Sequence, residues 1–297
     1  MDDVGESSLL NPNALGVTGT REKRVGRLST QWLATRGTHY LVRLVSLALG
    51  VWFWDVASTR GWHAIVNFAN VPTPVQVWDE WLVVLGQPHF YMDIGMSLLR
   101  IAISFGLAAV LGIVIGLGMG MSRLVRDIVG PYIEILRPIP AVAWIPLAII
   151  MWPTNESSIV FITFLGAFFP ITLSTMHGVE QTPDLLVRAA RTLGAGRGAV
   201  IRHVVLPAAL PSILSGLAIG MGVSWFSLLA GEIVSGRYGI GYFTWKAYEL
   251  IQYPDIIIGM LTIGLLGTLS TAIIRGLGRP LLRWQNTQGE GDDPWKR

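Results

Sequence analysis

Four charged residues interrupt the apolar runs that follow residue 58, namely Arg100, Glu134, Arg137 and Glu232. An ionisable group inside a bilayer is costly unless it is paired or hydrated, so each residue is a candidate for a structural ion pair or for a polar translocation path. Arg100 and Glu232 lie toward the outer ends of their runs and could pair at similar depth, or Arg100 could line a path for an anion. Glu134 and Arg137 are three residues apart and could pair along one helix.

Other reactive chemistry is missing from the sequence. The chain has no cysteine, and its five histidines are scattered without the spacing of metal ligands. We find no Ser/His/Asp or Cys/His constellation at membrane depth and no G-x-x-x-x-G-K-[ST] phosphate loop. The sequence therefore predicts no catalytic residue, no metal site and no ATP hydrolysis by this chain, which we expect not to be an enzyme.

The elements that must position the four charges are long apolar runs. With 297 residues, 52% hydrophobic and only 14% charged, the chain is too apolar for a soluble domain of this size. We predict an all-α, polytopic membrane protein. A helix needs about 20 apolar residues to cross a bilayer. Six runs approach that length, at residues 40–58, 94–121, 129–152, 159–176, 206–233 and 256–274.

Two runs carry a further signal. The second contains Gly112, Gly116 and Gly120, a spacing that lets another helix approach closely inside a bundle. The third contains four prolines and cannot be one straight helix. Breaks of this kind at membrane depth usually face protein or a polar path.

The charges outside the runs predict the orientation. With the N-terminus inside, most of the 22 lysines and arginines fall in or beside cytoplasmic segments, and only Arg60, Arg237 and Lys246 fall outside. The positive-inside rule therefore predicts six spans with both termini in the cytoplasm. It also places the polar stretch 181–207 on the cytoplasmic side. We do not expect nucleic-acid binding, because the basic residues lie in loops rather than on one surface.

The stretch 181–207 reads as a short helix between two spans. Thr182 is suited to cap its start, Pro183 to occupy the first helical position, and Gly194 to adopt the left-handed conformation that ends a helix. A helix of about a dozen residues is marginal alone in water and needs a surface to dock against. Its apolar residues recur at helical spacing, at Leu185, Leu186, Ala189, Ala190 and Leu193.

This stretch resembles the "EAA" loop of permease subunits in bacterial ATP-binding-cassette importers. The resemblance rests on Ala189-Ala190, Gly194 four residues later, Val204, and Leu206-Pro207. Arg188 stands where that family usually has the glutamate, and Val204 replaces isoleucine. In addition, the segment IEILRPIPAVAWIPL, residues 133–147, resembles permeases that import nitrate, taurine, other sulfonates or bicarbonate. The resemblance covers about residues 90–282.

The resemblance implies the assembly in which the chain works. Arg188, Ala189, Ala190, Gly194, Leu206 and Pro207 would form a coupling loop that docks on ABC ATPase subunits, which bind the ATP and Mg²⁺. A second permease copy, expected to be identical, would complete the path in the bacterial inner membrane, and an external solute-binding protein would deliver the solute. The expected organisation is a polar cytoplasmic tail at 1–39, a lipid-embedded permease domain at 40–282 and a polar cytoplasmic tail at 283–297.

The sequence is also compatible with two other functions. A secondary transporter or channel could use the intramembrane charges as an ion relay, and its loop would then be merely solvated. A membrane-embedded enzyme is a more distant alternative. The sequence does not choose among nitrate, taurine, alkanesulfonate and bicarbonate as the solute.

Overall fold

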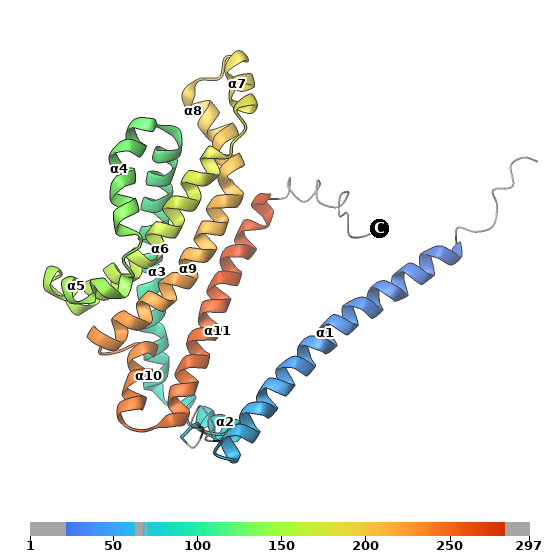
Figure 1. Ribbon diagram of the computed structural model, residues 1–297, viewed down its shortest axis with the longest axis vertical. Helices are drawn as coiled ribbons and strands as arrows, with labels where there is room; N and C mark the ends of the chain where they lie inside the picture. Colours follow the sequence, from blue (N-terminus) through green and yellow to red (C-terminus); the bar gives the residue numbers. More distant parts are fainter. Residues whose placement is uncertain (1–21, 63–67, 69, 283–297) are drawn as a thin grey trace, which may run out of the picture. The chain divides into compact units, whose positions relative to one another are not determined.

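The computed structural model describes residues 22–62, 68 and 70–282, and within them it is helical with no strand (Figure 1). The chain divides into two compact units, Met1–Pro74 and Val75–Arg297. The predicted all-α class is confirmed. The predicted C-terminal tail at 283–297 and the first 21 residues of the predicted N-terminal tail lie outside the described residues.

The first unit is dominated by helix α1, Glu22–Thr59. The chain after it folds back on the helix end, where Trp54 Nε1 donates to the carbonyl oxygen of Pro72 at 3.0 Å and Ser58 Oγ to that of Val71. Leu41–Thr59 is apolar enough to cross a membrane, as expected for the run at 40–58. Helix α1 begins at Glu22, within the segment predicted as a polar tail at 1–39.

The second unit holds the remaining helices. In chain order these are α2 (Pro74–Val84, which begins at the unit boundary), α3 (Pro88–Met121), α4 (Arg123–Leu136), the 3₁₀ turn η2 (Ala141–Trp144), α5 (Ile145–Met151), α6 (Asn155–Glu180), α7 (Asp184–Thr192), α8 (Arg197–Val200), the π-helical turn η3 (Ile201–Val205), α9 (Leu206–Ser235), α10 (Ile240–Glu249), α11 (Tyr253–Gly278) and the 3₁₀ turn η4 (Pro280–Leu282).

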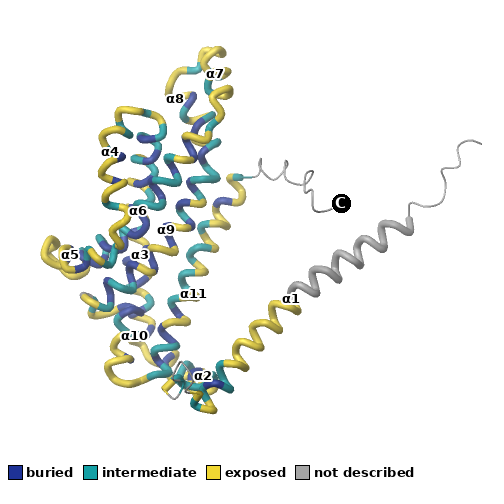
Figure 2. Tube along the Cα trace, in the orientation of Figure 1, coloured by how far each residue is buried: buried dark blue, intermediate teal, exposed yellow. Residues whose placement is uncertain are grey.

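Helix α6 forms the centre of this unit, packed between α3 and α9 (Figures 1 and 2). The predicted close approach at the glycines of α3 is confirmed. Side-chain carbons at Gly112, Gly116 and Gly120 would lie within 3.0 Å of Ile171, Thr172 and Val179 of α6. Without a strong hydrophobic drive between helices in lipid, such close backbone packing is what holds the helices together.

The proline-rich third run is broken, as predicted. Helices α4 and η2–α5 meet at 89° across residues 137–140, which include Pro138 and Pro140. Proline at these positions removes backbone donors and prevents a continuous helix. The described residues contain five single helices long and apolar enough to span a membrane, and the bent pair makes a sixth.

The spans begin earlier than the apolar runs predict. Helix α3 starts at Pro88 rather than residue 94, because proline fits a first helical turn. Helix α6 starts at Asn155 rather than residue 159, because Thr154 Oγ1 accepts a hydrogen bond from the Ser157 backbone N–H at 3.2 Å. At about 1.5 Å per residue, Arg100 therefore lies about 18 Å along the helix from its observed start, against about 9 Å from the predicted one.

Candidate functional site

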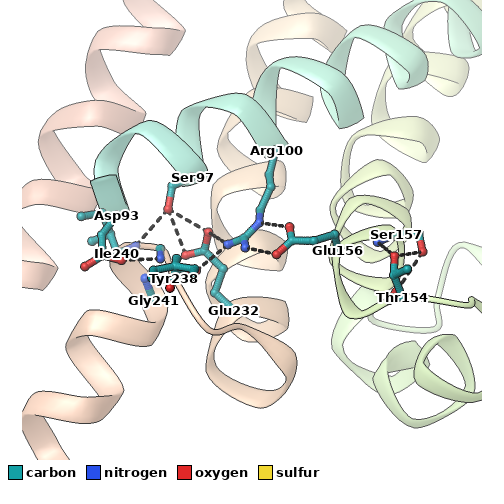
Figure 3. Close-up of polar contacts among 11 residues, drawn as sticks. Asp93, Ser97, Arg100, Thr154, Glu156, Ser157, Glu232, Tyr238, Ile240 and Gly241 are labelled. Carbon is teal, nitrogen blue, oxygen red and sulfur yellow. Dashed lines mark hydrogen bonds and ion pairs between the residues drawn. The ribbon is translucent and has the colours of Figure 1, made fainter. Parts of the chain in front are cut away.

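One face of α3 carries a buried row of polar side chains. Asp93, Ser97, Arg100 and Ser104 follow one another at intervals of four, three and four residues, so they share one side of the helix, and all four are buried. The row faces the ends of α6 and α9 and the segment that leads into α10 (Figure 3). It forms the polar centre of this end of the bundle.

Arg100 is the hub of the row. Its guanidinium is 2% exposed and contacts two carboxylates and a carbonyl. Nε and Nη2 donate to the two oxygens of Glu156 at 2.8 and 2.6 Å, a bidentate pair. Nη1 donates to Glu232 Oε1 at 2.8 Å and to the carbonyl oxygen of Tyr238 at 2.6 Å. One residue thus joins α3, α6 and α9 to the loop after α9.

The Glu232 side chain is only 1% exposed, and its carboxylate accepts hydrogen bonds from further donors. Ser97 Oγ donates to its two oxygens at 2.8 and 3.0 Å, and the backbone N–H of Gly241 donates to Oε2 at 2.9 Å. Burying a carboxylate is tolerable only when it is paired and hydrogen-bonded in this way. Glu232 therefore holds the start of α10 onto the end of α9.

The loop between α9 and α10 is fixed by the same network. Asp93 Oδ1 accepts from the Gly239 N–H at 2.8 Å, and Ser97 Oγ accepts from the Ile240 N–H at 2.9 Å. Gly239 has a φ of 122°, and a side chain there would collide with the Glu232 carboxylate. Only glycine suits this position, because it combines a positive φ with close approach to a buried charge.

Arg100 and Glu232 therefore form a structural ion pair, which is one of the two possibilities that the sequence leaves open for Arg100. The sequence reasoning missed Glu156, which lies outside the apolar window but inside the first turn of α6. It also missed Asp93 and Ser97, although their spacing from Arg100 on one helix face was a readable signal. A relay of intramembrane charges is not favoured, because these two charges are paired and buried.

Glu134 and Arg137 do not form the pair considered from their spacing. Among the described residues no ion pair joins them, and both side chains are exposed. Helix α4 ends at Leu136, so Arg137 is the cap residue at the break rather than part of a continuous helical face. The backbone of Arg137 is still helical, since its N–H donates to the Ile133 carbonyl at 2.9 Å, so helical spacing by itself did not produce the pair.

The stretch 181–207 contains the predicted short helix, α7. Its C-terminus is a Schellman motif, in which the Ala195 N–H donates to the Ala190 carbonyl at 3.0 Å and the Gly194 N–H to the Arg191 carbonyl at 2.9 Å. Gly194 has a φ of 85°, as its predicted left-handed role requires. The predicted Thr182 cap is wrong, because Pro183 occupies the cap position and the Thr182 hydroxyl donates back to the Gly178 carbonyl at 3.5 Å.

Helix α7 has an apolar face that no described residue covers. Leu185 and Leu193 are 74% and 88% exposed, and Leu186 and Ala189 are exposed between them (Figure 2). Ala190 instead turns inward with Val187. They pack against a buried cluster of Val179, Val200, Val205, Ala209 and Ile213. The two adjacent alanines therefore serve different surfaces, which their joint place in the sequence motif does not reveal.

Leu206 and Pro207 lie where the loop enters α9. The five residues before them form the π-helical turn η3, in which the Leu206 N–H donates to the carbonyl of Ile201. A proline cannot donate and its ring crowds the carbonyl four residues earlier, so a widened turn relieves the clash at His203. Helix α8, η3 and α9 then run on as one element, Arg197–Val234, so the helical run begins before the predicted span at 206–233.

The loop also rests on the ends of the neighbouring helices. A pocket of about 660 Å³ lies between its inner face and the start of α4, lined among others by Ser122, Glu180, Arg191 and Arg197. Next to it, Arg126 of α4 pairs with Glu180 of α6 at 2.7 Å. Helix α6 therefore connects this end of the bundle to the Arg100 network at its other end.

These features define the class of the protein, a polytopic membrane component with a rigid polar end and, at the opposite end, an exposed helical loop with an open apolar face. Residues 108–284 match the family described as "Binding-protein-dependent transport system inner membrane component". This chain belongs to that family, which makes it a multi-pass membrane subunit of a transport system and not an enzyme.

Three similar proteins, each named as the permease of a transport system, support membership in this family. The chain is 34% identical to the taurine transport system permease protein of Escherichia coli (strain K12) over 87% of this chain and 94% of the relative. It is 35% identical to the nitrate import permease protein of Synechocystis sp. over 68% and 76%. It is 39% identical to the bicarbonate transport system permease protein of Synechococcus elongatus over 63% and 68%.

Solved structures confirm the fold. The crystal structure of an amino acid ABC transporter with histidines superposes with a TM-score of 0.54 at 18% identity, covering 72% of this chain and 99% of that one. The MetNI methionine ABC transporter in an inward-facing conformation superposes with a TM-score of 0.51 at 22% identity, covering 68% and 95%. The architecture is that of an importer permease.

Proposed function

We propose that this chain is the permease subunit of an ATP-driven importer and that α7 couples it to partner ATPases. The observation that carries the proposal is the exposed apolar face of α7 formed by Leu185, Leu186, Ala189 and Leu193. Exposed leucines on a short helix outside the apolar spans mark a protein contact. The Schellman end and the inward packing of Ala190 hold this face in a fixed orientation, as a docking surface requires.

ATP and Mg²⁺ belong to the partners in this proposal. The permease supplies the path, two ATPase subunits supply the phosphate chemistry, and an external binding protein delivers the solute. A second copy of this chain completes the path, since importer permeases work in pairs. The solute is a small anion or zwitterion of the taurine, sulfonate, nitrate or bicarbonate type, a class supported by what the related permeases are named for.

The direct test is uptake by the reconstituted complex. Proteoliposomes that contain this chain, its ATPase and its binding protein should accumulate labelled taurine, nitrate or bicarbonate only when ATP is present on the ATPase side. Uptake driven by an ion gradient without ATP would contradict the proposal and favour a secondary transporter.

A topological prediction accompanies the proposal. Both termini and the α7 loop should lie in the cytoplasm, because the basic residues gather on that side. Reporter fusions at Asp184 and after Arg283 should read cytoplasmic, and a fusion at Lys246 should read external. An external reading at Asp184 would remove α7 from the side where ATP is found and would end the coupling argument.

A further inference from the structure

A pocket of about 590 Å³ opens at the break between α4 and η2. The break itself forms one wall with Arg137 and Pro140, α6 contributes Gly166 and Phe169, and α9 contributes Ser227, with further residues of the same segments around them. Gly166 and Phe169 lie near the middle of α6, Asn155–Glu180, which spans the membrane. The pocket therefore lies at about the middle of the bilayer.

Arg137 is a free cation in this wall. Within the part of the chain that the structure describes, its guanidinium takes part in no ion pair or hydrogen bond, and its side chain is exposed. A cation and an interrupted helix at this depth are tolerated only where they line a wet or polar cavity. Arg100, by contrast, is fully paired, so the two membrane arginines have different tasks.

Ser227 supplies a second unused polar group. Ser227 lines the pocket, but its side chain is 1% exposed, and Oγ, which has no hydrogen-bond partner, is covered and lies against Gly166, so the hydroxyl must turn to reach a ligand in the pocket. Most buried hydroxyls in this bundle instead donate to the carbonyl four residues earlier, as Thr163 and Thr172 do. A buried hydroxyl left without a partner calls for an explanation, and a ligand in the pocket is one.

We propose that this pocket is an intramembrane site for a small oxyanion, held by the Arg137 guanidinium and the Ser227 hydroxyl. A planar guanidinium can donate two parallel hydrogen bonds to a nitrate, bicarbonate, carboxylate or sulfonate group, and the hydroxyl can donate a third. Phe169 and Phe226 provide apolar walls for the remainder of the solute. This proposal rests on the proposed function and adds to it the residues that recognise the solute.

Matched variants can test the site in the reconstituted complex with labelled taurine, nitrate and bicarbonate as probes. Arg137→Gln should lower the ratio of the maximal uptake rate to the half-saturating solute concentration at least tenfold, because it removes a charge-assisted hydrogen bond to the solute. Arg137→Lys should recover part of the loss. Ser227→Ala should lower the ratio about fivefold. ATPase stimulation by the loaded binding protein should remain within about twofold, because that contact lies elsewhere.

Two controls separate the site from its surroundings. Ser224 is equally buried and also without a partner, but it does not line the pocket, so Ser224→Ala should leave uptake unchanged. Arg123, an exposed cation at the other end of α4, should tolerate Arg123→Gln. Equal effects of Ser224→Ala and Ser227→Ala would overturn the role of Ser227.

Other outcomes would overturn the site as a whole. Wild-type uptake by Arg137→Gln would do so directly. A loss of permease dimer and of thermal stability in Arg137→Gln would instead assign Arg137 to an ion pair with the second copy. A wild-type complex that shows no ATP-driven uptake of the three probes would overturn the proposed function, and it is recognised without any variant.

Discussion

Ala189→Glu is expected to abolish ATP-driven uptake while the permease stays folded and inserted in the membrane. Ala189 lies on the exposed apolar face of α7, where a glutamate is harmless to the isolated subunit because it reaches water. In a docked complex the same carboxylate would be buried without a partner. That costs roughly 3 kcal/mol or more, which weakens the contact more than a hundredfold.

The measurement is co-purification of the ATPase with the permease variant, together with uptake. Ala199→Glu makes the same substitution at an exposed site on α8 and should have a small effect. Equal losses in both variants would show that the docking surface is not the α7 face. Retained ATPase binding with wild-type uptake in Ala189→Glu would end the importer mechanism proposed above.

Ala190→Glu and Gly194→Val should behave differently from Ala189→Glu. Ala190 packs against the valine cluster beneath the loop, so a glutamate there should disturb the loop itself. Gly194→Val forces a β-branched residue into a left-handed conformation, at a cost of about 1–2 kcal/mol. Both variants should abolish uptake and increase protease sensitivity around residues 181–207, whereas Ala189→Glu should lose uptake without that sensitivity.

Glu232→Ala is expected to be among the most destabilising single substitutions in the bundle, at about 3–5 kcal/mol, because it leaves the Arg100 guanidinium buried without one of its two carboxylate partners. Arg100→Ala should be comparable, since it leaves Glu232 buried without its cation. Glu156→Ala should cost less, because Glu156 is 51% exposed and water can screen its charge.

Thermal unfolding of the purified subunit in detergent can rank the three variants. In the double variant Arg100→Ala/Glu232→Ala, the loss should be smaller than the sum of the single losses, because the pair is removed as a unit. An additive double variant would contradict the ion pair. Normal stability with lost uptake in Arg100→Ala would instead assign Arg100 to the solute path.

The local features of this chain were readable from its sequence. Hydropathy located the spans, because a helix in lipid satisfies its backbone within one segment and needs only length and apolar side chains. The prolines predicted that the third run is broken, although not at which residue, and Gly194 predicted the end of α7, because both residue types act through their own backbone geometry. The glycines of α3 predicted a close helix contact, although not that α6 would supply it.

Contacts between segments were decided only by the tertiary structure. The similar depth of Arg100 and Glu232 allowed a pair, but the bidentate contact with Glu156 arises because Thr154 starts α6 early enough to bring that carboxylate to Arg100. Thr182 looked like a helix cap, yet Pro183 takes the cap position and the Thr182 hydroxyl donates to the Gly178 carbonyl of the preceding helix. Ala189 and Ala190 are adjacent in one motif, and only the packing of α7 on its valine cluster turns one outward and the other inward.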